Sequence, residues 1–432
     1  MKSKKVKVFI VLWLKVYLLN AQSISTPRST LNIDLEIKPR VELTDNYRFS
    51  TSEDFERDIF VIQRNRVLIN FHGKNVRFHA SPQEIHLFNK EGENQKIGAI
   101  NAYEFYLEPR LTKNSSIRLG RQGISLDNGR LYSDSPWAQQ GQSHEGLRYI
   151  FKSDLQSLDV IGAFTRKYYD PYEVAFSPVA SHKYKYLLVA NYKRKVNQNW
   201  TYSLLNTVDF YDNPTLNKTR LPRFTSGGRL EYYANDFYAT LNAHYQFGKN
   251  VDAKVINAFY LQPEISYNTG KFRNRLGAEI MSGDAETITS DRTRAFVPLY
   301  GVAWKFMGNM NFYTKFPADV NSKGLVDPYL FVFYDLNKKL TLRADFHLFY
   351  SQFAQKDAKK NELNKFLGFE NDLSFQYKAR RNVDVNFGFS FYKQGESMVL
   401  LKKTKAVDDT PVWSYLSVSY RPNLLNKTFK KG

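Results

Sequence analysis

The chain has 432 residues, a formal net charge of +20 and no cysteine. The lack of cysteine excludes disulfide bridges, lipid attachment through a cysteine and thiolate metal sites. The basic residues are dispersed and form no recognised binding motif, which argues against a nucleic-acid partner. The excess of positive charge fits either basic loops that face an anionic membrane surface or a basic pore for anionic solutes.

Aromatic residues are abundant, with 29 Tyr and 33 Phe, although the mean hydropathy is only −0.50. A soluble protein would bury these rings in one or more cores, whereas a membrane β-barrel displays them toward lipid. Low hydropathy with many rings is expected when every second residue of a strand is polar. No run of about 18 apolar residues follows the N-terminal region, so no membrane-spanning helix is predicted in the mature chain.

The N-terminal residues 1–21 have the pattern of a signal peptide. Lysines stand at positions 2, 4, 5 and 7, an apolar segment follows at 8–19, and Ala21 precedes a plausible cleavage point. We therefore exclude residues 1–21 from the fold. Residues 22–34 are expected to form a periplasmic lead-in, and residues 422–432 a basic C-terminal tail.

Between these ends, about 18 segments alternate apolar and polar residues, the period of a strand with two different faces. The predicted strands are 35–44, 59–71, 76–88, 99–110, 116–122, 145–151, 155–165, 184–193, 199–211, 224–234, 237–247, 255–267, 272–281, 326–336, 339–350, 366–379, 382–392 and 412–420.

The gaps between the predicted strands alternate in length along the whole chain. Turns of two to five residues alternate with mostly longer gaps, of which 123–144 and 282–325 are the longest. Short periplasmic turns and long outer loops produce this rhythm in transmembrane barrels. The sequence therefore predicts an all-β fold, a transmembrane antiparallel β-barrel over residues 35–421, in the bacterial outer membrane with both termini in the periplasm.

Charged residues dominate the predicted inward face of the strands. The inward arginines are Arg64, Arg66, Arg110, Arg118, Arg148, Arg229 and Arg343. Acidic residues such as Glu104, Glu108 and Asp345 share that face, so opposite charges could pair and hold the wall together. Alternatively, unpaired arginines could form a constriction that attracts anions. Both interpretations stay open.

The 44-residue gap 282–325 is the best candidate for a loop that folds into the lumen. It carries the apolar cluster Phe296, Leu299, Tyr300, Trp304 and Phe306, which is unusual for a solvated loop. About 18 strands leave an open lumen unless loops fill it.

Two stretches resemble the signature of the alginate export family of outer-membrane barrels. The first contains Gly120-Arg121-Gln122, Gly129-Arg130-Leu131, Trp137, Gly141 and Gly146-Leu147-Arg148, and the second begins Phe296-Val297-Pro298. The resemblance implies an 18-stranded barrel with an arginine-rich pore for an anionic polysaccharide. The resemblance also implies that the pore or its mouth contains Arg121, Arg130 and Arg148. The chain departs from the family pattern at Glu145, Trp304 and Asn309, which keeps a general anion porin as an alternative.

These observations predict a channel for anionic solutes or an anionic polysaccharide. The alternatives are a diffusion porin without marked selectivity and, less favoured, an outer-membrane lipid-modifying enzyme. The expected partners are outer-membrane lipid, lipopolysaccharide, the anionic solute or polysaccharide and periplasmic export proteins. No cofactor or metal is predicted: the seven histidines are scattered, and His244 and His347 are interpreted as hydrogen-bonded wall residues.

Overall fold

The computed structural model describes residues 29–45, 57–88, 100–165, 184–212, 220–285, 291–303, 305–402 and 410–429. The expected signal peptide, the first part of the expected lead-in and Trp304 lie outside these ranges.

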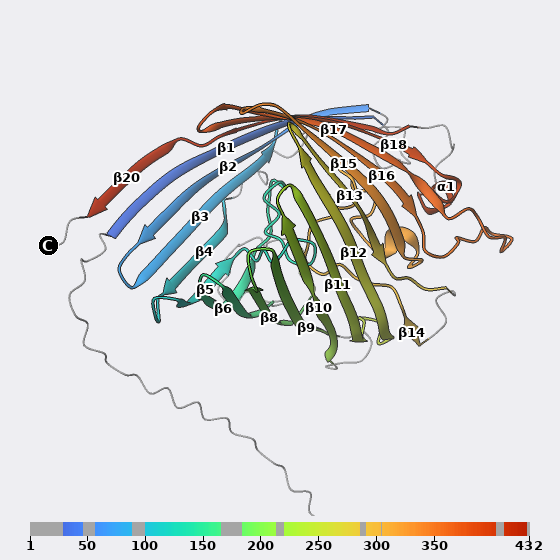
Figure 1. The fold of residues 1–432 in the computed structure, drawn as a ribbon, viewed down its shortest axis with the longest axis horizontal. Coiled ribbons are helices and arrows are strands. Elements are labelled where there is room, and N and C mark those ends of the chain that lie inside the picture. The colour runs from blue at the N-terminus through green and yellow to red at the C-terminus, as the bar shows by residue number, and fades with distance from the viewer. Residues whose placement is uncertain are drawn as a thin grey trace, which may run out of the picture.

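The described chain forms one antiparallel β-sheet that closes into a barrel (Figure 1). The wall strands are β1 (Ser29–Asp45), β2 (Arg57–His72), β3 (Val76–Leu87), β4 (Asn101–Pro109), β5 (Ser115–Gln122), β6 (His144–Lys152), β7 (Gln156–Phe164), β8 (Tyr186–Lys195), β9 (Trp200–Asp212), β10 (Arg220–Ala234), β11 (Phe237–Lys249), β12 (Val255–Thr269), β13 (Phe272–Met281), β15 (Leu325–Asn337), β16 (Leu340–Tyr350), β17 (Phe366–Arg380), β18 (Val383–Gln394) and β19 (Val412–Tyr420). Each wall strand pairs with the next, and β19 closes the barrel on β1, with Arg40 opposite Ser417.

Two of the 20 strands in the sheet do not add to this wall. The two-residue strand β14 (Arg292–Thr293) lies parallel to β12 within a loop connection, and β20 (Asn423–Phe429) continues β19 along the first half of β1. Without these two, the described wall has 18 strands. The predicted fold class is confirmed.

Burial along the strands is the inverse of that in a soluble protein. On β12, Leu261 and Ile265 are 36% and 49% exposed on the outer face, whereas Gln262 and Glu264 are 2% and 4% exposed on the inner face. Apolar side chains on the outside are stable only against hydrocarbon, and a closed barrel satisfies every backbone group of the wall without water. The wall is therefore that of a membrane-spanning barrel.

Strand pairing extends beyond both predicted ends of the barrel. β1 begins at Ser29, inside the expected lead-in, and pairs there with β20, which occupies the expected basic tail; Leu31, for example, lies opposite Lys427. Figure 1 shows β20 beside the outer part of β1. The sequence pattern misses β20 because all its residues are exposed, so the strand has no apolar–polar alternation to detect. Its main-chain pairing with β1 depends little on side-chain type.

Two long connections fold into the barrel and pack against each other. We call them the β5–β6 loop (residues 123–143) and the β13–β15 loop (residues 282–324). The Tyr300 N–H donates to the carbonyl of Leu131 at 2.9 Å, and the Ser133 N–H donates to the carbonyl of Tyr300 at 3.2 Å. The apolar cluster predicted an inward fold of the second loop, and the structure has it. Both loops join wall residues in one buried cluster inside the barrel.

Helical structure is limited, among the described residues, to the short 3-10 helix η2 (Ala318–Val320) and helix α1 (Glu396–Lys402). No helix in this part of the chain is long and apolar enough to cross a membrane.

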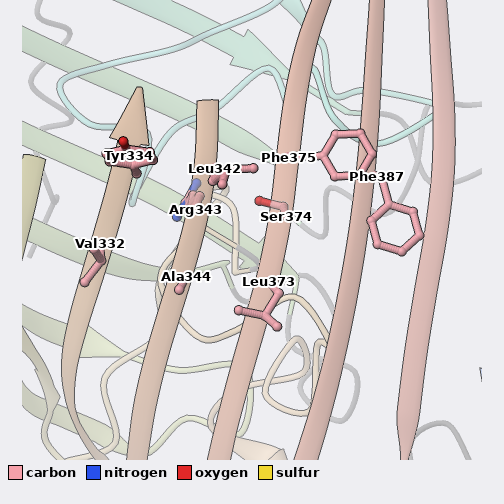
Figure 2. A pocket seen from close by; sticks show the side chains of 9 residues that line it. All are labelled: Val332, Tyr334, Leu342, Arg343, Ala344, Leu373, Ser374, Phe375 and Phe387. Carbon is pink, nitrogen blue, oxygen red and sulfur yellow. The ribbon is translucent and has the colours of Figure 1, made fainter. Parts of the chain in front are cut away.

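A hollow of about 320 Å³ lies on the wall between β15 and β18 (Figure 2). It is lined by Val332, Tyr334, Leu342, Arg343, Ala344, Leu373, Ser374, Phe375 and Phe387. Leu342 and Leu373 are more than 40% exposed, so the hollow opens on the outer face. In a bilayer this face contacts acyl chains, and the hollow is not part of a path through the barrel.

Candidate functional site

The inner face of the wall changes character along the barrel axis. On β12 the inward residues near the long-loop end are Ile256, Ala258 and Tyr260, and those near the short turn are Glu264 and Ser266. The apolar end packs under the two inner loops. The charged end lies below them, and this half of the lumen is where a solute would meet ionised side chains.

Cationic side chains surround the lumen near the short turns. Each stands within five residues of the short-turn end of its strand, and each lies on the inward parity of that strand. They are Arg118 on β5, Arg148 on β6, Lys193 on β8, Arg229 on β10, Arg275 on β13 and Arg343 on β16. The other five predicted arginines occupy other places. We call these six residues the basic ring.

Every member of the basic ring has a carboxylate partner. The N···O distances are 2.7 Å for Arg118–Glu108 and Arg148–Asp159, 2.8 Å for Lys193–Glu231, 3.2 Å for Arg229–Glu231, 2.6 Å for Arg275–Glu264 and 2.5 Å for Arg343–Asp345. Even Arg118 and Arg148, which face each other directly across β5 and β6, have separate acidic partners. The expectation that like charges on neighbouring strands leave unpaired arginines is therefore wrong for these residues.

Four of the six pairs are nevertheless asymmetric with respect to the lumen. The Arg275 side chain is 25% exposed while its partner Glu264 is 3% exposed, and the Arg343 side chain is 23% exposed while Asp345 is 6% exposed. The side chains of Arg118 and Lys193 are likewise more exposed than those of their acidic partners, whereas the two members are about equally exposed in the Arg148 and Arg229 pairs. In the four asymmetric pairs the cationic group therefore faces the water-accessible space, and the carboxylate lies behind it in the wall.

Lys305 brings a further cation from the β13–β15 loop toward this ring. Its Nζ donates to the carbonyl of Asn128 at 2.7 Å. Burial lowers the pKa of Lys305, and the positive charges of Arg275, Arg229 and Arg343 lower it further, against a smaller opposite effect of Glu264. The ammonium group thus lies in a region of positive potential despite the nearby carboxylates.

Three predicted pore arginines are covered by the inner loops and act as anchors. Arg64 pairs with Glu36 at 2.7 Å and donates to the carbonyls of Ala138 and Gln139 at 2.9 and 3.1 Å. Arg66 donates to the Gln83 side chain and stacks 3.8 Å from the centre of the Tyr103 ring.

Arg130 is the third anchor, and it lies in the β5–β6 loop. Its Nη2 donates to the carboxylate of Glu279 at 3.0 Å, and its Nη1 donates to the carbonyl of Val302 at 3.1 Å. Desolvation would lower its pKa, but the charge of Glu279 and the hydrogen bonds raise it above the ordinary value, so the side chain stays cationic. Arg64 and Arg130 hold loops against the wall directly, and Arg66 contacts Gln83 and Tyr103, which donate to the loop carbonyls of Gln140 and Asp134.

Arg110 and Arg121 lie away from the lumen. Arg110 is exposed at the short-turn rim, where it bridges to Ser116. Arg121 pairs with Glu145, whose side chain is 54% exposed, and has the same parity on β5 as the outward Leu119. The structure therefore corrects the family-derived pore position of Arg121, because β5 keeps its regular pairing through residue 122 and no bulge turns the side chain inward.

The sequence analysis missed several cations near the lumen, among them Arg275, Lys38 and Lys305. Arg275 could have been found, since alternation from Phe272 places it inward. Lys38 is buried at 7% exposure and donates to the carbonyls of Pro136 and Trp137, both at 3.3 Å. Lys305 lies in an irregular loop, so no sequence period could place it.

One group of side chains among the described residues could hold a metal ion. Asp345, His347 and Asp372 are all buried and present ligand atoms within 4.8 Å of one another. They lie on β16 and β17, next to the basic ring residue Arg343.

A closed 18-stranded wall, apolar outside and charged inside, defines an outer-membrane β-barrel channel. A family model described as alginate export matches residues 29–405. The match covers most of the chain, so the chain belongs to the alginate export family. No curated protein is significantly similar to it in sequence.

Solved structures of outer-membrane channels share the fold. OpdK from Pseudomonas aeruginosa is 12% identical with a TM-score of 0.60, covering 91% of this chain and 98% of that chain. OccAB4 from Acinetobacter baumannii is 10% identical with a TM-score of 0.61, covering 93% and 99%. OpdO from P. aeruginosa is 12% identical with a TM-score of 0.63, covering 91% and 98%. At these identities the likeness shows the fold, and with the family match it places the protein in the bacterial outer membrane as a channel.

Proposed function

We propose that the channel is selective for anions and that small anionic solutes pass along the basic ring. The observation that carries this proposal is the asymmetry of four ion pairs of the ring, in which the cation faces the lumen and the carboxylate is recessed. A paired arginine still attracts an anion when its charge is nearer to the solute than that of its partner, because Coulomb energy falls with distance. The pairing fixes the arginine in place and lets it remain charged beside its neighbours.

The inner loops favour a small solute over a long polymer. The β5–β6 and β13–β15 loops join the wall in a buried cluster, so the described lumen is filled in its long-loop half. A solved structure of OpdK, one of the channels that share the fold, is described with vanillate, a small carboxylate. We propose the same chemical class for this chain: a small organic carboxylate or a comparable anion, carried by a channel and not modified by an enzyme.

The test is a reversal potential across a planar bilayer under a salt gradient. Wild type is expected to be anion-selective. Arg275→Gln combined with Arg343→Gln should move the reversal potential toward zero, because it removes the two cations and leaves their carboxylates. The matched control, Glu264→Gln combined with Asp345→Asn, removes the recessed partners and should preserve or increase anion preference. Cation selectivity in wild type, or equal shifts in both double variants, would refute the proposal.

Export of an anionic polysaccharide is the second candidate, favoured by the match of the family model described as alginate export. It requires the inner loops to leave the lumen, since they fill it in the described state. Liposomes that contain the channel should distinguish the two. Uptake of a small carboxylate without uptake of alginate oligomers supports the first proposal, and passage of the oligomers supports the second.

A further inference from the structure

We propose that the wall of the barrel contains a site for one divalent transition-metal cation, Mn²⁺ or Zn²⁺, bound by Asp345, His347 and Asp372. This site adjoins the basic ring, because Asp345 is also the partner of Arg343, but it does not depend on which solute the channel passes. No sequence motif predicts this site, because its three residues lie on two strands with no metal-ligand spacing.

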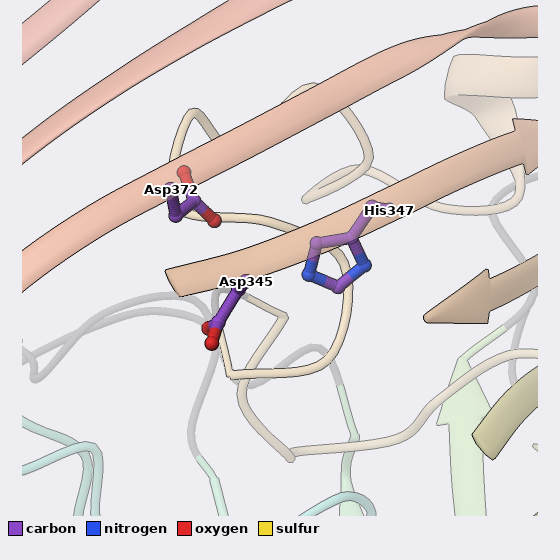
Figure 3. A group of neighbouring side chains, drawn as sticks. All are labelled: Asp345, His347 and Asp372. Atoms are coloured by element: carbon purple, nitrogen blue, oxygen red, sulfur yellow. The ribbon is translucent and has the colours of Figure 1, made fainter. Parts of the chain in front are cut away.

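The three side chains come together because β16 and β17 pair in register. Asp345 lies directly opposite Asp372, and His347 follows two residues later on the same face of β16. Figure 3 shows Asp345 and His347 on one strand beside Asp372 on the next, with one ring nitrogen of His347 on the side of the aspartates. The ligand atoms lie within 4.8 Å of one another, so small side-chain movements bring all three to a single ion at about 2.0–2.2 Å.

One ring nitrogen of the histidine is already engaged, which leaves the other one for a metal. Its Nδ1 lies 2.9 Å from a carboxylate oxygen of Asp327. A carboxylate on one ring nitrogen fixes the tautomer and leaves the Nε2 lone pair for a cation, an arrangement that accompanies most metal-binding histidines. Asp327 and His347 are 0% and 1% exposed, so bulk water does not compete for either group.

A second observation that points to a cation site is a pair of buried carboxylate oxygens without a donor. Asp372 Oδ1 and Glu370 Oε2 are buried and have no hydrogen-bond partner among the described residues. Asp372 and Glu370 are only 2% and 0% exposed, and as residues i and i+2 of β17 they share one face. Ser390, opposite Asp372 on β18, contributes at most a neutral hydroxyl. Buried carboxylates are normally paired with a cation or bound to a metal. Apart from backbone N–H groups, these two side chains have only each other and the Ser390 hydroxyl as hydrogen-bond partners among the described residues.

The local charge balance points the same way. Four buried carboxylates gather here: Asp327, Asp345, Glu370 and Asp372. Arg343 pairs with Asp345 at 2.5 Å and offsets one of them. With His347 neutral, three negative charges remain, and with His347 protonated, two remain. A divalent cation would offset most of this charge, and the mixed set of two carboxylates and one imidazole suits Mn²⁺ or Zn²⁺ better than Ca²⁺ or Mg²⁺.

The site also touches the β13–β15 loop. The Asn309 N–H donates to Asp372 Oδ2 at 3.1 Å, and the Met310 N–H donates to Glu370 Oε1 at 2.8 Å. The loop contact to Asp372 uses Oδ2 and leaves Oδ1 without a donor. A cation bound at Oδ1 would therefore hold Asp372 in the orientation that receives the loop, and it would help to keep the loop inside the barrel.

The experiment measures metal retained by the whole folded protein. Wild type is refolded into detergent with Mn²⁺ or Zn²⁺, passed through a chelating column and analysed by mass spectrometry for metal content. About one ion per chain is expected. Asp372→Asn combined with His347→Gln should retain almost none, and Asp335→Asn, an exposed carboxylate on β15, should retain as much as wild type. The heat-modifiable gel shift verifies that each variant is folded.

The Asp327→Asn variant provides a second test, a measurement of Mn²⁺ affinity, because Asp327 orients the histidine and is not itself a proposed ligand. It should weaken Mn²⁺ affinity by about 10- to 100-fold while leaving the barrel folded. The Mn²⁺ electron paramagnetic resonance signal reports the bound ion directly. Wild type without retained metal, or equal retention in the ligand variants, would overturn the proposal and mean that the acids hold protons instead.

Discussion

Arg130 and Glu279 lie 149 residues apart in the sequence and form an ion pair inside the barrel. Their side chains are 2% and 0% exposed. Because Arg130 also donates to the carbonyl of Val302, one side chain joins the β5–β6 loop, the β13–β15 loop and the wall strand β13. A buried charge pair therefore ties both inner loops to the wall.

Replacing Arg130 by Met should destabilise the folded protein by about 3 to 5 kcal/mol, because it leaves the Glu279 carboxylate buried without a partner. The free energy of unfolding, measured by denaturant titration in lipid vesicles, checks this value. The control is Arg130→Met combined with Glu279→Met, which removes both charges and should recover most of the loss. If the double variant is as unstable as the single one, the role of Arg130 is packing and not charge compensation.

The sequence predicted the wall of the barrel well because side chains of a strand alternate between its two faces, which a short stretch of sequence reveals. Outward Leu261 and inward Gln262 differ in burial as period-two alternation requires, and the same rule located Arg118, Arg148, Arg229 and Arg343 on the inner face. The rule cannot say how deep a side chain lies or what covers it. Arg64 and Arg66 have the correct parity, yet loop residues from another part of the chain cover Arg64.

The loops themselves could not be placed from the sequence. Arg130 pairs with Glu279, and Lys305 binds the carbonyl of Asn128, through contacts between segments with no common period. The proposed cation site depends in the same way on the register of β16 against β17, which sets Asp345 opposite Asp372. Strand pairing of this kind is fixed by the closed sheet as a whole.

Gly308→Ala should loosen the β13–β15 loop. A Cβ at this position would lie 2.3 Å from the Glu370 carboxyl carbon, and the φ angle of +76° disfavours a side chain. We expect faster cleavage of the loop by added protease and larger fluctuations of single-channel current. Gly270→Ala is the matched control: its φ is +56°, and no atom lies within 4 Å of the added Cβ. Equal effects of the two variants would show that backbone strain alone, without the contact to Glu370, explains the result.

The long connections should be extracellular and the short turns periplasmic. An epitope inserted between the exposed Lys359 and Lys360, in the connection between β16 and β17, should bind antibody on intact cells. The same epitope between Arg380 and Arg381, in the short turn before β18, should bind only after the outer membrane is permeabilised. The reverse pattern of labelling would invert the topology of the barrel.

Lys305 should make anion preference depend on pH in the alkaline range. Its ordinary pKa of 10.5 is lowered first by burial and then by the charges of Arg275 and Arg229. Protonation is therefore lost at a lower pH than for an exposed lysine, and the lumen loses one positive charge as the pH rises. The reversal potential, measured between about pH 7 and pH 10, should shift toward zero in wild type. Lys305→Met should start from weaker anion preference and lack this part of the pH dependence.

Lys305→Arg separates charge from shape in the same measurement. A guanidinium stays protonated throughout this range, so the variant should keep its anion preference at the pH where wild type loses it. If the reversal potential of Lys305→Arg shifts toward zero at alkaline pH as much as that of wild type, another group causes the pH dependence. If the reversal potential of Lys305→Met depends on pH as steeply as that of wild type, another group is again responsible, and Lys305 does not lie on the conduction path. At about pH 10 we expect Lys305→Arg to be the most anion-selective and wild type to resemble Lys305→Met. This order follows only if the Lys305 ammonium faces the passing anion.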